Sequence, residues 1–136
     1  MAHLIKEGGL DKKIKVDSAG MIGFHAGEKA DPRSRKHAED RGIELTSIAR
    51  QFVANDDFHD FDYILAMDKR NFSDLMKLDP NKEFSHKIFM MTDFCSEKKV
   101  KEVPDPYYSG ANGFEVVLDI LEDACTGLLD KIKTEL

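Results

Sequence analysis

One stretch of the sequence combines an acid, two prolines and two aromatic rings: Pro104-Asp105-Pro106-Tyr107-Tyr108. Proline fixes φ and has no N–H, so the acid lies on a stiff segment that joins neither a helix nor an inner strand. A carboxyl group on a stiff surface loop, with rings beside it, suits contact with a flat partner. The alternative is a plain turn whose tyrosines cover the edge of a core. The rest of the chain decides between these interpretations.

Two further polar residues, Ser18 and Asp68, come at the ends of segments that we expect to be strands. Residues 13–18 alternate polar and apolar side chains, which predicts a strand with one solvated side. Residues 61–67 form a nearly continuous apolar run, which is typical of a strand covered on both faces. A third strand is predicted at residues 87–91.

Helices are predicted between and after these strands. Residues 31–41 and 68–78 each open with an aspartate that can serve as the N-cap, and a short helix is expected at residues 2–6. Residues 55–58 suggest a short capped turn. After the Asp105 loop, apolar residues recur at three- and four-residue steps and predict a long C-terminal helix that packs on the sheet. These residues are Phe114, Val117, Leu118, Leu121, Cys125, Leu128, Leu129 and Ile132.

The alternation of strands and helices predicts an α/β fold with a parallel sheet flanked by helices, in a single domain of residues 1–136. Ligand sites in such folds lie at the carboxyl ends of the strands. Ser18, Asp68 and the loop after Met91 would all lie at that edge.

Composition excludes several classes of function. The net charge of −6 argues against a nucleic-acid-binding protein, which would show a basic stripe. No apolar run approaches the roughly 20 residues that cross a bilayer, so we expect no membrane partner and a cytoplasmic chain. Cys95 and Cys125 are far apart, and the five histidines show no metal-binding spacing. We therefore expect no disulfide framework, no metal and no cofactor.

Taken together, these segments resemble the low-molecular-weight protein tyrosine phosphatases in order and spacing, over essentially all 136 residues. The Asp-Pro-Tyr-Tyr motif at 105–108 is the most specific part of the resemblance. The supporting motifs are Val16-Asp17-Ser18-Ala19-Gly20, Gly27, Asp31-Pro32-Arg33, Ala49-Arg50-Gln51 and Phe61-Asp62-Tyr63-Ile64-Leu65-Ala66-Met67-Asp68.

The resemblance implies a chemistry without metal, acting on a phosphotyrosine protein or a small aryl phosphate. A cysteine thiolate attacks phosphorus, and an aspartic acid protonates the departing phenolate and later takes a proton from water. It implies that Asp105 is this general acid and base. Tyr107 and Tyr108, with Phe24 opposite, would wall the slot for the substrate ring. Ser18 would donate a hydrogen bond that shapes the phosphate loop, or else cap its own turn at the end of a strand.

One part of the family's pattern is absent. The family opens with a strand and a Cys-x-x-x-x-x-Arg loop that holds the nucleophile and grips the phosphate. Here Lys101 stands six residues after Cys95, and Lys131 six after Cys125. We expect that the chain begins inside the family's first helix, lacks the first strand, and is inactive on its own. Two open sheet edges would remain, which could close on each other or form a homodimer.

Three other functions compete with this interpretation. The first is a catalytically dead, phosphatase-like binding protein that keeps the aromatic slot. The second is an arsenate reductase of the same fold, which would need extra cysteines; residues 68–72 have none, and the double tyrosine favours an aryl phosphate. The third is a receiver-like domain with Asp68 as phosphoacceptor at the end of a strand.

Overall fold

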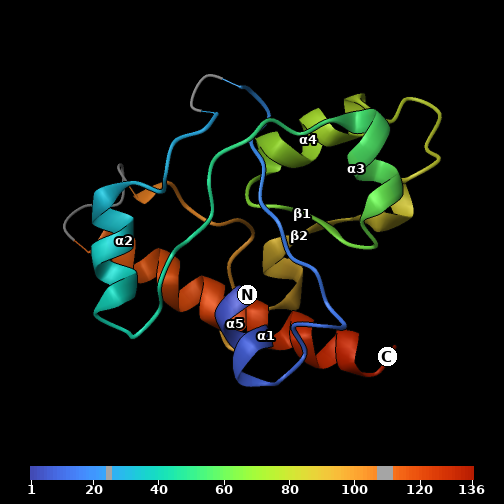
Figure 1. Ribbon diagram of the computed structural model, residues 1–136. Helices are drawn as coiled ribbons and strands as arrows, with labels where there is room; N and C mark the ends of the chain where they lie inside the picture. Colours follow the sequence, from blue (N-terminus) through green and yellow to red (C-terminus); the bar gives the residue numbers. More distant parts are fainter. Residues whose placement is uncertain (24–25, 107–111) are drawn as a thin grey trace.

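Two short parallel strands, β1 (Ile64–Ala66) and β2 (Ile88–Met90), form the centre of the computed structural model. The structure describes residues 1–23, 26–106 and 112–136. The strands pair in register from their first residues, and helices lie on both sides of them (Figure 1). The α/β class, with a parallel sheet flanked by helices, is thus confirmed.

The helices fall into two groups around this sheet. α3 and α4 lie on one side, and α1, α2 and α5 lie on the other (Figure 1). Their bounds are α1 (Ala2–Glu7), α2 (Pro32–Glu39), α3 (Ala54–Asp60), α4 (Lys69–Lys77) and α5 (Gly113–Lys133), with short 3-10 turns η1 (Ser85–Lys87) and η2 (Met91–Phe94). None of the helices in the described ranges is long and apolar enough to cross a bilayer.

Each face of the sheet covers a separate hydrophobic core. Successive side chains of a strand point to opposite faces, so Ile64 and Ala66 enter one core and Leu65 packs against the other. The first core comprises Phe58, Ile64, Ala66, Leu75 and Ile88. The second comprises Met91, Val103, Ile120, Ala124, Cys125 and Leu128. The apolar run at residues 61–67 is therefore covered on both faces as predicted, although the strand itself is shorter.

Local capping fixes where two of the helices begin. The carboxylate of Asp31 accepts a hydrogen bond from the backbone N–H of Arg33 at 2.8 Å, and α2 starts at the next residue, Pro32. Asp68 accepts from the N–H of Asn71 at 2.7 Å, directly before α4. These contacts satisfy N–H groups that have no partner within the helix. Both predicted N-caps are confirmed.

The long helix α5 packs closely on η2. Its most buried positions include Ile120 and Ala124 as well as the predicted Cys125. A Cβ atom on Gly127 would lie 2.0 Å from the carbonyl oxygen of Phe94, so only glycine allows this approach. The prediction that Cys125 belongs to the core is confirmed.

The strand predicted at residues 13–18 is wrong. Residues 14–19 form neither helix nor strand, and Val16 is 44% exposed. An isolated parallel β-bridge between Gly20 and Gln51 lies just after this segment. Alternation can give a segment two different faces, but a strand also needs a neighbour that accepts its backbone hydrogen bonds. No described residue provides that neighbour.

The short turn predicted at residues 55–58 is also wrong, because this stretch lies within α3. The carboxylate of Asp57 accepts a hydrogen bond from the N–H of Val53 at 2.8 Å, which supports the first turn of the helix. Phe58 is 2% exposed in the core, and its packing stabilises a helix that is short by itself.

Candidate functional site

The loop that bears Asp105 follows η2 and lies against the carboxyl end of β1. The N–H of Val103 donates to the carbonyl oxygen of Met67 at 2.7 Å, one residue beyond that strand. Val103 is itself buried in the core under α5. Asp105 follows two residues later and is exposed to solvent. The acid therefore lies close in sequence to a backbone that is fixed by both hydrogen bonding and burial.

Two further contacts hold the approach to Asp105. The carboxylate of Glu102 accepts a hydrogen bond from the N–H of Lys69, the first residue of α4, at 2.9 Å. The hydroxyl of Thr92, in η2, donates to the carbonyl oxygen of Lys101 at 3.0 Å. Consecutive loop residues are thus tied to two different elements.

Asp123 of α5 holds the beginning of the same loop. Its carboxylate accepts hydrogen bonds from the N–H groups of Ser96, Glu97 and Lys98 at 3.2, 3.0 and 2.7 Å, and from the Ser96 hydroxyl at 3.0 Å. These bonds, the one from Lys98 foremost, lower the pKa of Asp123 to about 2. The carboxylate stays ionised at neutral pH and fixes the turn against the helix.

Ser18 makes fewer contacts than the residues around the Asp105 loop. It is exposed, and its N–H donates to the carboxylate of its neighbour Asp17 at 2.8 Å. Its hydroxyl makes no hydrogen bond to any residue that the structure describes, so the predicted cap of its own turn is not formed by that hydroxyl. The described contacts also include no hydrogen bond between Ser18 and Asp105.

Arg50 links the segment around Ser18 to α3. Its Nε donates to Asp17 at 2.9 Å, while its two terminal nitrogens contact both carboxylate oxygens of Asp57 at 2.9 and 3.0 Å. The hydrogen bond from Arg50 is the largest cause that lowers the pKa of Asp57, which is 6% exposed. The same pair raises the pKa of Arg50. A bidentate contact of this kind fixes orientation as well as charge.

The aromatic wall predicted from the sequence falls largely outside the described part of the chain. Phe24, Tyr107 and Tyr108 lie there, and their roles stay predictions. Next to Pro106, the described residues enclose an apolar cavity of about 220 Å³. Its lining is Ser34, Leu45, Pro106, Phe114, Val117, Leu118 and Leu121. Four residues of the predicted apolar stripe of α5 therefore face this cavity.

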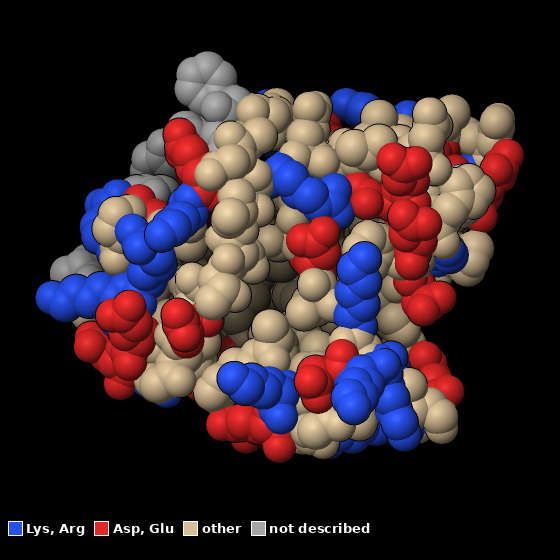
Figure 2. Space-filling view, viewed as in Figure 1, with Lys and Arg blue, Asp and Glu red and all other residues tan. Residues whose placement is uncertain are grey.

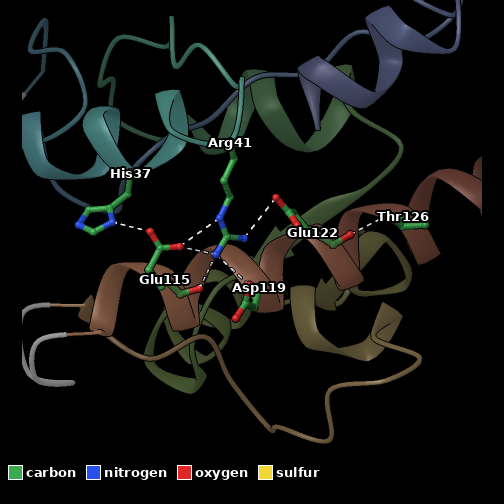
Figure 3. A network of polar contacts seen from close by, with 6 residues as sticks. All are labelled: His37, Arg41, Glu115, Asp119, Glu122 and Thr126. Atoms are coloured by element: carbon green, nitrogen blue, oxygen red, sulfur yellow. Dashed lines mark hydrogen bonds and ion pairs between the residues drawn. The ribbon is translucent and has the colours of Figure 1, made fainter.

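A polar network fixes α2 against the first half of α5 (Figure 3). Arg41 contacts three carboxylates on α5, those of Glu115, Asp119 and Glu122. His37 contacts Glu115 from the other side at 2.6 Å. Hydrogen bonds from His37 and then Arg41 lower the pKa of Glu115. The helix that follows the Asp105 loop is thereby held at its N-terminal end.

Neither cysteine has the setting of a nucleophile. The Cys95 thiol is half-buried and lies 3.8 Å from the carbonyl oxygen of Ile120, and burial raises its pKa. A raised pKa keeps the thiol protonated, whereas a nucleophile must be a thiolate. Cys125 is buried in the core. Within the described ranges, no group of three or more His, Cys, Asp or Glu residues could hold a metal ion.

The sequence motif predicts Asp105 as a site residue, but the residues that hold its loop were not predicted. Thr92, Glu102 and Asp123 lie in ordinary polar surroundings in the sequence, and their partners are 9, 33 and 25–27 residues away. The sequence contains one weak sign of these contacts: Asp123 is an acid next to the apolar stripe of a long helix. An acid at such a position usually lies on the solvated face of the helix, so it was not singled out.

Comparison with known proteins gives a consistent result. A family model described as low molecular weight phosphotyrosine protein phosphatase matches residues 1–136. The low molecular weight phosphotyrosine protein phosphatase 1 of Drosophila melanogaster is 40% identical over 119 residues, which cover 87% of this chain and 76% of the relative.

Solved structures agree with the family model. A protein tyrosine phosphatase of Entamoeba histolytica superposes with a TM-score of 0.91 at 45% identity, covering 98% of this chain and 84% of that one. YfkJ of Bacillus subtilis gives a TM-score of 0.88 at 36% identity, covering 98% and 82%. The chain belongs to the low molecular weight phosphotyrosine protein phosphatase family.

Proposed function

We propose that this chain provides the general acid and base of phosphotyrosine hydrolysis, and that Asp105 is that residue. The observation that supports this most is the anchoring of its loop, through the 2.7 Å hydrogen bond from Val103 to Met67. A proton donor must be held within reach of the departing oxygen, and a loop fixed at the carboxyl end of a strand provides such a position.

The proposed reaction has two steps. In the first, a cysteine thiolate forms a bond to phosphorus while the bond from phosphorus to the phenolic oxygen breaks, and Asp105 gives its proton to that oxygen. In the second, water attacks the phosphocysteine, Asp105 takes a proton from this water, and the thiolate leaves with phosphate as the other product. Tyr107, Tyr108 and Phe24 are proposed to hold the phenyl ring, and Ser18 to support the phosphate loop.

The nucleophile of this reaction is not among the 136 residues, because they contain no Cys-x-x-x-x-x-Arg sequence. We propose that the chain alone does not turn over aryl phosphates. The two free cysteines, Cys95 and Cys125, suit the reducing cytoplasm, where we propose that it acts as one domain on phosphotyrosine proteins or small aryl phosphates.

A chimera tests the role of Asp105. The strand and Cys-x-x-x-x-x-Arg loop of a relative are joined ahead of Met1, and hydrolysis of p-nitrophenyl phosphate is measured across pH. Asp105→Asn should lower kcat by roughly 10²–10⁴-fold, the usual contribution of a general acid. Asp130→Asn, an exposed acid on α5, is the matched control and should change little. Equal kcat for the Asp105→Asn and parent chimeras would remove Asp105 from the mechanism.

The missing motif also supports a second candidate, a binding protein that engages phosphotyrosine without cleaving it. Calorimetric titration of the 136-residue chain with a phosphotyrosine peptide separates the two. Saturable binding that is weakened for the unphosphorylated peptide favours the second candidate. Absence of binding at millimolar peptide concentration would contradict the second candidate and favour the first, in which the chain is one part of an enzyme.

We also propose that the chain forms a homodimer through its exposed sheet edge. Among the described residues, β1 pairs on one edge only, and residues 15–19 make no hydrogen bond between backbone groups. Figure 2 shows a hollow near the centre of this side of the molecule. Light scattering after size exclusion should give a mass that rises with concentration. A monomer over a hundredfold concentration range would contradict the proposal.

A further inference from the structure

A second surface feature lies between α4 and two loops on the same side of the sheet. It is a groove of about 370 Å³ that opens to solvent. Its lining is Met21, Ile22, Gln51, Phe52, Ala54, Asp74, Lys77 and Leu78. None of these residues belongs to the proposed catalytic machinery, so the groove requires its own explanation.

Two large apolar side chains of the groove are exposed to solvent. Ile22 is 72% exposed and Leu78 is 45% exposed. Beneath them, Met21 and Phe52 pack against the core that contains Phe58. The groove therefore has a firm apolar floor and two large apolar side chains at its rim. The groove thus offers room and apolar contacts for one bulky side chain of a partner.

Two opposite charges lie beside this apolar floor. Asp74 and Lys77 are one helical turn apart on α4, on the face that lines the groove. The side chains of both make no hydrogen bond or ion pair with any residue in the described ranges. A ligand with a basic group near Asp74 and an acidic group near Lys77 would complement this arrangement.

We propose that this groove binds a peptide segment of a partner protein. The segment inserts one bulky apolar side chain between Ile22 and Leu78, and it places a basic residue at Asp74 and an acidic residue at Lys77. A peptide is favoured over a small molecule because the groove is open, whereas small-molecule sites enclose most of their ligand. The proposal does not depend on the phosphatase chemistry.

Two synthetic heptapeptides serve as probes, and chemical shifts of the 15N-labelled 136-residue chain serve as the readout. Both have phenylalanine at the centre. One carries lysine two residues before it and glutamate two residues after it, and the other carries the two charges in reverse order. A third peptide has alanine at the centre. At least one phenylalanine peptide should produce saturable shifts in the groove, and the alanine peptide should bind at least about tenfold more weakly.

Variants then locate the binding. Lys77→Glu, an exposed change, should weaken the better peptide by at least about fivefold, because the acidic residue loses its partner. The double variant Asp74→Lys with Lys77→Glu should reverse the preference between the two peptides. Leu78→Ala should weaken both, whereas Lys133→Ala, an exposed change at the end of α5 outside the groove, should weaken neither. Shifts outside the groove, no saturation for either peptide, or affinities unchanged by Lys77→Glu would each overturn the proposal.

Discussion

Residues 61–67 and residues 13–18 both have strand-like sequences, but only the first stretch contains a strand. Ile64 and Ala66 of β1 are 8% and 2% exposed, and β2 pairs with them. Val16 is 44% exposed and belongs to no ladder. The difference shows that a strand in this molecule requires cover on both faces, which an apolar run indicates, and a neighbour at its edge, which the strand's own sequence does not encode.

The same contrast extends to the candidate site. The Asp105 loop is tied to the ordered stretch by the hydrogen bond from Val103 to Met67. It is also held by contacts from α4, η2 and α5. Ser18 is the last residue of the unpaired stretch. Arg50 links this stretch to α3, and the isolated bridge between Gly20 and Gln51 follows two residues later. The Asp105 loop is therefore held by contacts to several elements, whereas the segment that ends at Ser18 is held by Arg50 and by the backbone bridge at Gly20. The following predictions test this contrast.

The first prediction compares the two stretches directly. Ile64→Ala should lower the free energy of unfolding by about 3 kcal/mol, because it leaves a cavity in a packed core. Val16→Ala should lower it by less than about 0.5 kcal/mol, because Val16 is 44% exposed and belongs to neither core cluster. Urea unfolding followed by circular dichroism measures both. Similar losses would show that residues 13–18 are packed as firmly as β1.

Close packing on the ordered side gives the second prediction. Gly127→Ala should cost about 2–3 kcal/mol, because the added methyl group clashes with the backbone of Phe94. Thr126→Ala, one residue earlier and exposed, is the control and should change the free energy of unfolding by less than about 0.5 kcal/mol. Equal effects of the two substitutions would argue against the close approach of α5 and η2.

The third prediction concerns the link between the two stretches. Asp57→Asn should cost about 2 kcal/mol, because the bidentate contact with Arg50 is lost and the asparagine keeps only part of the hydrogen bonding. The folded-state pKa of Asp57 is lowered below its value in the unfolded chain. Its contribution to stability is therefore complete above about pH 4 and disappears as pH falls through the folded pKa.

Unfolding at pH 7 and at pH 2.5 checks this third prediction. The difference in stability between the parent and Asp57→Asn should be large at pH 7 and smaller at the lower pH. A difference that is the same at both values would mean that Asp57 does not titrate with a lowered pKa.

The fourth prediction has the smallest expected effect. Thr92→Val keeps the shape of the side chain but removes the hydrogen bond to Lys101, which should cost about 1 kcal/mol. Amide exchange should quicken in residues 101–103 more than in α4. Thr134→Val serves as the control, since its hydroxyl donates only to Lys131, three residues earlier, at the C-terminal end of α5. Unchanged exchange at residues 101–103 would remove Thr92 from the contacts that hold the Asp105 loop.

Local patterns predicted much of this fold. The caps at Asp31 and Asp68, both strands of the sheet and the long C-terminal helix all follow from spacing within one segment. The failures at residues 13–18 and 55–58 have a common cause, because each outcome depends on contacts with distant residues. For the candidate site, Asp105 could be proposed from its motif. The roles of Asp123 and Thr92 could not be predicted, because their hydrogen-bond partners are brought to them only by the tertiary fold.

The most direct test of the account is the hydrolysis of p-nitrophenyl phosphate by the purified 136-residue chain, with and without Asp105→Asn. We expect no turnover above background for either protein, because neither contains the Cys-x-x-x-x-x-Arg sequence that the proposed reaction requires. Turnover by the parent chain that is lost in Asp105→Asn would contradict it. That result would mean that a nucleophile within these 136 residues, or water itself, attacks the phosphorus.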